Sequence, residues 1–526
     1  MEILSQMLHK KLLIPILLFT FLILLPIAIL FVESFVVEGG GISIEPLKSL
    51  LLTSRQFGLM KNSLALAMGT TLFSLLVGVP LAFLLNRTDL PFRNFFNLVY
   101  LVPLVIPPYL QATVWTKFFS PDQGGFQWLS LYGIAGGIFV YTLSFFPFVT
   151  LIASSGLRSI GASLEEVSLT TRNALGTIRG ITLPLITPHI TSGAILVFVF
   201  TLVNFEAADI LRLRVYPIEI FINFSAYYNE KAATLLSVPL ISVSMLLIWG
   251  QTALMRGKSY ANFESSGKGG ILFGLGPLKP ICFACVTLLI IVSIIIPLWM
   301  LVKGAGPLEN YSKAFTGSRE QIFYSLWVSA VSSLIMVLFS LGASYYLERE
   351  KGFLRTLLDF LIQTPFGVPS IVVGIGLIRV WNHPWTDWVY GTSAILIIGL
   401  ITGYAPFVVK IVSTKMKQIH REFEEAAMLA TSNGFRIFTK ILLPLFVPAL
   451  IAGFMMGFIL SLSNLGTALL VAAPGRATLP IKIYNFMHYG AEEIVFASNL
   501  ILMAMIALAL VILYPSFRLL RRWSRL

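Results

Sequence analysis

A short polar segment of the chain reads Phe423-Glu424-Glu425-Ala426-Ala427-Met428-Leu429-Ala430-Thr431-Ser432-Asn433-Gly434, and Ile441-Leu442-Leu443-Pro444 follows it. Ala, Met, Leu and Glu favour helix, and Asn-Gly supplies a stop because glycine readily takes the left-handed C-cap conformation. The proline fits the first turn of a new helix. The segment holds no nucleophile–base pair, metal-ligand set or phosphate loop. Since long apolar runs flank it, it predicts a docking helix between membrane spans.

This segment occurs twice in the chain. Ile160 through Leu164-Glu165-Glu166 matches Ile419 through Phe423-Glu424-Glu425, and Leu183-Pro184 matches Leu443-Pro444. Upstream and downstream of the segment, Arg87 pairs with Arg349 and Asn204 with Asn464. The register slips by one to three residues only in loops, where insertions are tolerated. The chain is therefore predicted to be two copies of one module.

The two copies of the segment resemble the EAA loop of ABC importer permeases, whose pattern is I-P-x-E-L-E-E-A-A, then G, then L-P. The second copy matches this pattern at Ile419, Glu422, Phe423, Glu424, Glu425, Ala426, Ala427, Leu443 and Pro444. Thr431 replaces the glycine of the pattern, and His420 replaces its proline. The first copy is degenerate, because Val167-Ser168 replaces the alanine pair. Its key carboxylate maps to Glu166, with Glu165 as the alternative.

The composition is that of a membrane protein: 57% of the residues are hydrophobic, 12% are charged, and the mean hydropathy is +0.86. Apolar runs of roughly 20 residues match the thickness of a bilayer core. The sequence predicts an all-α polytopic membrane protein of about 12 transmembrane helices in two tandem six-helix modules. The expected spans lie near 12–33, 58–85, 95–117, 132–153, 189–211, 233–254, 281–302, 322–346, 357–380, 392–412, 447–472 and 494–515.

The predicted domain organisation follows from the repeat. Residues 1–254 form a first permease module with its EAA loop at 155–188, and residues 280–526 form a second with its EAA loop at 414–446. Residues 255–279 join them as a Gly/Ser-rich, charged linker. Most of the 37 Lys and Arg residues fall in one set of loops, which includes both EAA loops. The positive-inside rule places those loops, and both termini, in the cytoplasm. This bias and anionic lipid explain the net charge of +13 without a nucleic-acid partner.

Polar residues at the predicted outer end of the fifth span of each module could line a translocation path: Asn204, Glu206, Asp209 and Asn464. Charged side chains within spans are costly and usually functional. Glu206 and Asp209 are three residues apart and would share a helix face. They could equally pair with Arg212 or Arg214 at the interface, or ligate a metal directly. No metal site is predicted, and these alternatives stay open.

The resemblance implies a pathway between two halves, powered by a cytoplasmic ABC ATPase dimer and supplied by an extracytoplasmic solute-binding protein in a bacterial-type inner membrane. The residues expected to couple to the ATPase are Glu165, Glu166, Glu424, Glu425, Ala426, Ala427, Pro184 and Pro444. The chain itself would bind no cofactor and catalyse no reaction, because its partner uses the ATP. Family likeness favours iron(III) as the solute, with thiamine and 2-aminoethylphosphonate as alternatives. An ion-gradient-driven secondary transporter is the alternative of another class.

Overall fold

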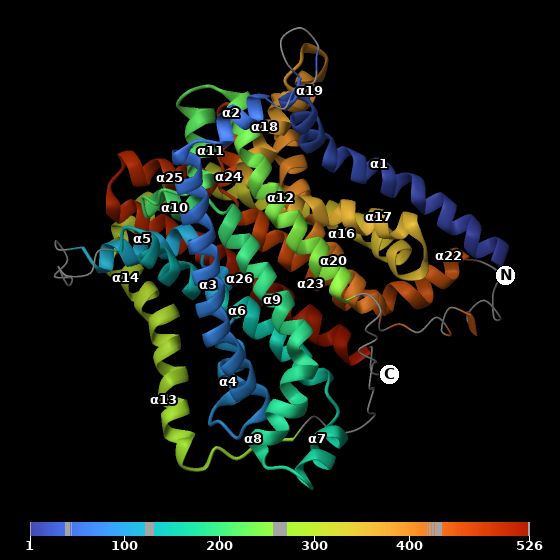
Figure 1. Cartoon of the computed structure of the whole chain (residues 1–526). Coiled ribbons are helices and arrows are strands. Elements are labelled where there is room, and N and C mark those ends of the chain that lie inside the picture. Colours follow the sequence, from blue (N-terminus) through green and yellow to red (C-terminus); the bar gives the residue numbers. More distant parts are fainter. Residues whose placement is uncertain are drawn as a thin grey trace. The chain divides into compact units, whose positions relative to one another are not determined.

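The computed structural model of the chain describes residues 2–36, 41, 43, 45–120, 131–255, 271–417, 419, 422, 425–426 and 434–523 (Figure 1). In these ranges every regular element is a helix, and an isolated β-bridge pairs Thr88 with Phe273. Ten of the described helices are long and apolar enough to cross a membrane, or up to twelve if each of two bent pairs counts as one span. The prediction of an all-α polytopic protein with about 12 spans is therefore confirmed.

The chain forms two compact units. One comprises Leu47–Ala232 and Leu236–Gly304, and we call it the first-loop unit because it holds the first EAA loop. The other comprises Met1–Pro46, Ala233–Leu235 and Ala305–Leu526, and we call it the second-loop unit.

The first-loop unit is built on α3 (Ser54–Arg87), α6 (Ile134–Ser159) and α9 (Leu183–Val203), which pack against one another. Gly78 of α3 lets these helices approach closely, since a Cβ there would lie 2.9 Å from the carbonyl oxygen of Phe146. Small residues serve this purpose at helix contacts within membranes. The other elements are α2 (Glu45–Leu51), α4 (Arg93–Val99), η1 (Val102–Val105), α5 (Pro108–Phe118), α7 (Ala162–Leu169), α8 (Ala174–Thr177), η3 (Ile178–Thr182), α10 (Glu206–Ile210), α11 (Tyr216–Ser225), α12 (Glu230–Met255), η4 (Gly276–Leu278), α13 (Lys279–Ile290), η5 (Ile291–Ile295) and α14 (Ile296–Ala305).

The second-loop unit repeats this core with α16 (Arg319–Arg349), α20 (Ser393–Lys417) and α23 (Leu443–Leu462), which also pack against one another. Its remaining elements are α1 (Glu2–Ser34), α15 (Leu308–Gly317), α17 (Phe353–Gln363), η6 (Thr364–Gly367), α18 (Ser370–Trp381), η7 (Pro384–Thr386), α19 (Asp387–Tyr390), α22 (Gly434–Ile437), η8 (Phe438–Leu442), α24 (Gly466–Val471), α25 (Leu479–Tyr489) and α26 (Glu492–Trp523).

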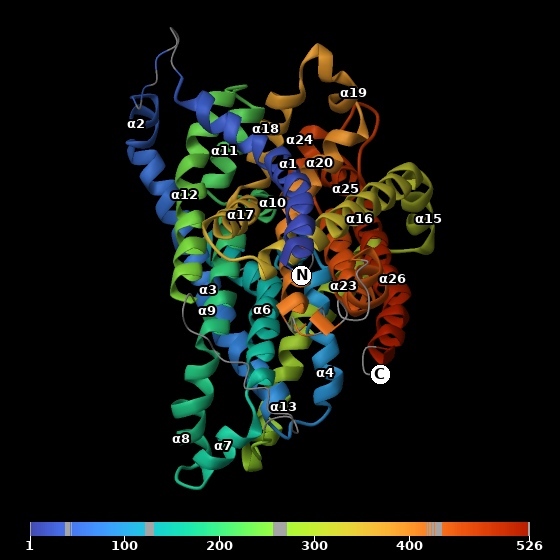
Figure 2. The same cartoon turned by 90° about the vertical axis from the view of Figure 1, so that its right-hand side faces the viewer.

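The two units exchange the first helix of each sequence repeat. Helix α1 belongs to the second-loop unit, where Glu33 forms an ion pair with Arg379 of α18 at 2.6 Å. Helices α13 and α14 belong to the first-loop unit, and α13 runs alongside α4 and the adjoining end of α3 (Figures 1 and 2). The modules 1–254 and 280–526, drawn from the sequence repeat, stay a prediction. The compact units differ from them by this exchange.

The third predicted span of each module is broken at its prolines. The helical segments Arg93–Val105 and Pro108–Phe118 meet at 92°, and Phe353–Gly367 and Ser370–Trp381 meet at 107°. Proline has no N–H group to continue a helix and disfavours helical geometry in the residue before it. Pro107 and Pro369 accordingly lie in extended conformations at the two breaks.

The fifth span of each module differs from its prediction, because neither is one continuous helix. Within predicted span 189–211, α9 ends at Val203 and the short helix α10 begins at Glu206. Within predicted span 447–472, α23 ends at Leu462 and α24 begins at Gly466. The physical reason lies in the asparagines at the breaks, whose side chains accept hydrogen bonds from the backbone of the following helix.

Candidate functional site: the first EAA loop

The first EAA loop is a helix–turn–helix that ends in a widened helical turn. Helix α6 ends at Ser159, α7 begins after Gly161, and Asn173 caps α8 by accepting a hydrogen bond from the backbone N–H of Gly176 at 2.8 Å. The π-helical segment η3 then leads into α9. Pro184 explains η3, since its ring and missing N–H prevent a regular α-helical turn just before it. A π segment, η8, stands at the matching place before Pro444.

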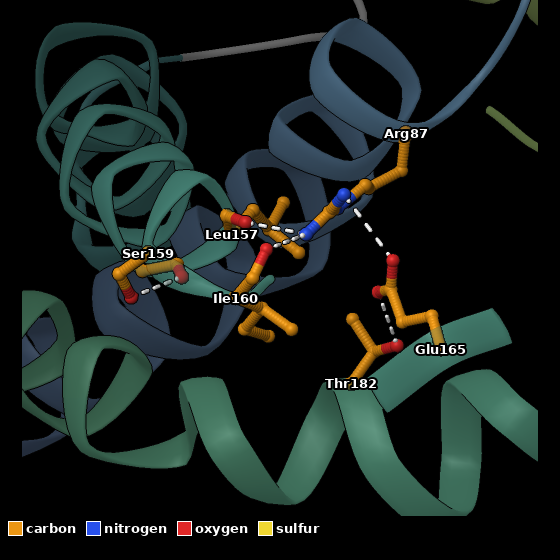
Figure 3. Close-up of polar contacts among 7 residues, drawn as sticks. Arg87, Leu157, Ser159, Ile160, Glu165 and Thr182 are labelled. Carbon is orange, nitrogen blue, oxygen red and sulfur yellow. Dashed lines mark hydrogen bonds and ion pairs between the residues drawn. The ribbon is translucent and has the colours of Figure 1, made fainter. Parts of the chain in front are cut away.

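A buried ion pair anchors α7 to the end of α3 (Figure 3). The Arg87 guanidinium lies 3.2 Å from a carboxylate oxygen of Glu165, and their side chains are 2% and 0% exposed. The hydroxyl of Thr182, in η3, donates a hydrogen bond to the other carboxylate oxygen at 3.0 Å. Arg87 also donates to the carbonyl oxygens of Leu157 and Ile160, at 2.6 and 3.2 Å. One arginine therefore joins the ends of α3 and α6 to α7, and we call this cluster of Arg87, Glu165 and Thr182 the latch.

The two adjacent carboxylates of α7 have opposite environments. Successive residues of a helix point about 100° apart. Glu165 is buried in the latch, whereas Glu166 is exposed. Val167 and, across the turn, Leu175 are also exposed, at 69% and 54%. The loop thus presents a carboxylate beside apolar side chains on its outer face, while Pro184 lies exposed at the start of α9.

The second EAA loop lies partly outside the described residues, and Glu424 and Ala427 are among the positions that the structure does not describe. Glu425 and Ala426 are helical and exposed, and Pro444 is exposed at the start of α23. Arg349, which ends α16, donates a hydrogen bond to the carbonyl oxygen of Ile419 at 3.0 Å. This bond repeats the one from Arg87 to Ile160.

Asn204 and Asn464 occupy matching positions at the breaks of the fifth spans. The side-chain oxygen of Asn204 accepts hydrogen bonds from the Tyr141 hydroxyl at 2.8 Å and from the N–H of Ala207 at 3.2 Å. Asn464 donates to the Tyr404 hydroxyl at 2.8 Å and accepts from the N–H of Ala468 at 3.1 Å. Both asparagines therefore hold the short helices α10 and α24 in place.

Glu206 and Asp209 lie in α10. Glu206 is buried, at 8% exposed, and close enough to Tyr109 and Tyr141 for electrostatic interaction. Asp209 is half-buried. The guanidinium of Arg212 lies 5.2 Å from the ring centroid of Tyr132. Across the described part of the chain, no three His, Cys, Asp or Glu side chains gather as a metal site would require. Whether Glu206 and Asp209 line a path stays a prediction.

Sequence reasoning missed the partners that give these residues their places. The sequence repeat pairs Arg87 with Arg349 but assigns neither a contact, and no sequence pattern marks Thr182, Tyr141 or Tyr404. The available signal was the repeat itself, because Arg87 and Arg349 match across the two modules, as do the asparagines. A basic residue retained at both copies of a helix end, next to both EAA loops, indicates a shared contact rather than chance positive charge.

The chain is a binding-protein-dependent transport system inner membrane component: the model of that family matches residues 74–260 and again residues 336–525. It is of the fused double-permease type and is a multi-pass membrane protein.

Its relatives include ferric permeases over most of the chain. The Fe(3+)-transport system permease protein FbpB 2 of Haemophilus influenzae is 27% identical over 83% of this chain and 85% of its own length. The ferric transport system permease protein FbpB of Actinobacillus pleuropneumoniae is 24% identical over 94% of this chain and 76% of its own. A shorter relative, the sulfate transport system permease protein CysT of Escherichia coli, is 29% identical over 39% of this chain and 75% of its own.

Proposed function

We propose that the chain is the transmembrane subunit of an ATP-driven importer, and that its two EAA loops dock onto a separate cytoplasmic ATPase dimer. The observation that carries this proposal is the opposite exposure of two adjacent carboxylates in α7: Glu165 is buried against Arg87, whereas Glu166 is exposed beside Val167. A helix fixed on its inner face and exposed on its outer face suits transmission of movement from a partner. Both loops and both termini would lie in the cytoplasm, as the basic loops indicate.

The coupling we propose needs no chemistry in this chain. ATP binding and hydrolysis would change the shape of the partner dimer, and the loops would contact its two states with different affinity. The exposed carboxylates Glu166 and Glu425 would meet basic groups on the ATPase, and the spans would alternate between inward- and outward-open arrangements. An extracytoplasmic binding protein would deliver the solute. ATP would serve the partner, not this chain.

We propose iron(III) as the solute, because relatives that match most of the chain are ferric transport permeases. The experiment that tests both parts is ATPase stimulation in lipid. The chain is purified with its co-isolating ATPase, and binding proteins loaded with iron(III), thiamine or 2-aminoethylphosphonate are added in turn. We expect the iron(III)-loaded protein to raise the ATPase rate.

Each other outcome corrects a different part of the proposal. Stimulation only by the thiamine- or phosphonate-loaded protein would keep the ATP-driven importer and replace its cargo. Failure of any ATPase to co-isolate, together with uptake that collapses when ion gradients are dissipated, would overturn the importer assignment in favour of a secondary transporter.

A further inference from the structure

The segment that leads into α13 is hydrogen-bonded to Arg87 of the latch and to Asp89, two residues further along the chain. The backbone N–H of Phe273 donates a hydrogen bond to the carbonyl oxygen of Arg87 at 2.8 Å, next to the bridge between Phe273 and Thr88. The carboxylate of Asp89 accepts from the N–H of Leu275 at 2.9 Å and from Lys279 Nζ at 2.7 Å. We call these contacts, made by residues 273–279, the clip.

The latch and the clip meet in Arg87. Its side chain forms the ion pair with Glu165 of α7, and its carbonyl oxygen accepts the hydrogen bond from Phe273, so the two attachments share one residue. Phe273 also stacks on Phe83, one turn earlier on α3, with ring centroids 5.9 Å apart. Beyond the clip, Val286, Ile290 and Ile294 continue the attachment through a buried cluster with Leu81 and Leu85 of α3.

We infer that Arg87–Asp89 is a positioning junction, which ties the first coupling helix α7 to the first helix of the second sequence repeat. This inference rests on the proposed coupling role of α7. Movement of α7 on its partner would be passed to α13 by way of Arg87, and displacement of α13 would shift α7. The junction thus links an EAA loop of one repeat to a membrane helix of the other, within one compact unit.

The buried charges of Arg87 and Glu165 determine the effect expected of each substitution at the junction. Glu165→Gln keeps an oxygen for Thr182 but leaves the guanidinium of Arg87 buried without its counter-charge. Arg87→Gln instead leaves the carboxylate of Glu165 buried without its counter-charge. The double variant Arg87→Gln/Glu165→Gln removes both charges, so its effect should not exceed that of either single variant, as expected of residues that act as a unit.

The test measures the position of α7 without any partner. Val167 on α7 and Leu151 on α6, both exposed, are changed to Cys and spin-labelled in a background with Cys282→Ala and Cys285→Ala, and the label–label distance distribution is recorded in lipid. Arg87→Gln, Glu165→Gln and Asp89→Asn should each broaden it. Phe273→Pro, which removes the N–H that binds Arg87, should broaden it more than Phe273→Ala, which removes only the ring. If Phe273→Pro does not fold, Asp89→Asn alone decides the role of the clip.

The matched control lies at the other end of α3, where Arg55 pairs with Glu219 of α11 at 2.9 Å. Glu219→Gln breaks an ion pair on the same helix and should leave the distribution unchanged. Broadening by the latch variants alone would overturn the junction, because α7 would then be held independently of the clip. No broadening by any variant would overturn the latch as well.

A second readout connects the junction to transport. With the ATPase bound, the latch and clip variants should retain the complex but lower the ratio of stimulated to basal ATPase rate at least several-fold, while Glu219→Gln keeps it. An unchanged ratio in all variants would overturn the junction as a coupling element. If no ATPase co-isolates, the proposed function fails, but the distance measurement on the chain alone still decides the junction.

Discussion

The hydroxyl of Tyr141 donates a hydrogen bond to Oδ1 of Asn204 at 2.8 Å, joining α6 to the break between α9 and α10. Asn464 and Tyr404 are hydrogen-bonded at the matching place in the other sequence module, also at 2.8 Å, but there the asparagine amide donates to the tyrosine hydroxyl. The asparagine oxygen also accepts from the backbone at the start of the short helix in both cases. A span that breaks within a membrane requires such partners, because lipid offers none to freed backbone groups.

This relationship predicts that Asn204→Ala destabilises the chain. The substitution leaves the buried Tyr141 hydroxyl and the N–H of Ala207 without their acceptor, which costs about 1–3 kcal/mol for a buried unsatisfied group. Thermal unfolding in detergent measures the loss. Asn62→Ala is the control, since Asn62 donates to the carbonyl oxygen of Arg214 at an exposed place. Full stability of Asn204→Ala combined with lost uptake would instead favour a direct role of Asn204 in the translocation path.

The all-helical fold and the repeat could be predicted from the sequence because they depend on local composition and on residue matches along the chain. Apolar runs fix the number of spans, and prolines such as Pro107 and Pro369 mark the breaks in the third spans. The break at Asn204 could not be predicted in the same way. The asparagine that accepts from the following helix also accepts from Tyr141, 63 positions earlier in the chain, and single-sequence patterns do not reveal such distant contacts.

The site was predictable in its location but not in its internal contacts. The position of the first EAA loop followed from Glu165, Glu166 and Pro184. Which carboxylate faces inward could not follow, because neighbouring helical residues differ only in direction and the direction is set by Arg87 on another helix. The exchange of α1 and α13 between the compact units was also beyond reach, since hydropathy places a helix in the membrane without choosing its neighbours.

Charge reversal at the exposed carboxylates should uncouple transport. Glu425→Arg is expected to lower uptake by roughly tenfold or more, equivalent to about 1.4 kcal/mol of lost coupling, while the protein stays folded and inserted. Glu166→Arg should have a smaller effect, because the first loop is degenerate. Uptake and ATPase rate in proteoliposomes measure both. Normal uptake by Glu425→Arg would refute docking through that residue, and equal damage from both would refute the ranking of the loops.

The hydroxyl group of Thr182 should contribute more to the stability of the fold than the volume of its side chain does. Thr182→Val keeps the shape of the side chain and removes the donor to the Glu165 carboxylate, and a hydrogen bond to a charged group contributes about 1.5–3 kcal/mol. Thr182→Ser keeps the donor and serves as the control. We expect a lower melting temperature for the valine variant only. Similar melting temperatures for both would show that Arg87 alone satisfies Glu165.

The clip should loosen in acid and stay intact near neutral pH. The hydrogen bond from Lys279 holds the pKa of Asp89 below its ordinary value, with the N–H of Leu275 adding to the effect. A carboxylate whose pKa is lower in the folded chain stabilises the fold above its unfolded pKa of about 3.9 and loses this contribution as pH falls through the folded value.

The label distance between α6 and α7 measures this pH dependence. The distance distribution should stay constant from about pH 5 to 8 and broaden only in stronger acid. In the Asp89→Asn variant the distribution should be the same in acid as at neutral pH. Because this pair is exposed, added salt should weaken the effect. Broadening that begins near neutral pH would point to a group other than Asp89.

Splitting the chain within 259–270, outside the described residues, should leave two fragments that assemble when expressed together. The covalent link is dispensable if α13 is held by packing, and its residues Val286 and Ile290 are buried against Leu81 and Leu85 of α3. Within a membrane this attachment depends on close packing and polar contacts such as Asp89 with Lys279, because lipid removes the hydrophobic driving force between helices.

Each fragment expressed alone should be degraded or aggregate, because each lacks a helix that its compact unit requires: the first fragment lacks α13, and the second lacks α1. Co-purification through a tag on one fragment, followed by an uptake assay, measures assembly.

The matched test introduces Asp89→Ala into both the split chain and the intact chain. In the split chain no covalent link supports the clip. The substitution should therefore lower the yield of co-purified fragment more than it lowers the yield of the intact chain. Failure of the unmodified fragments to assemble would mean that the linker holds the halves together and that packing of α13 alone is insufficient.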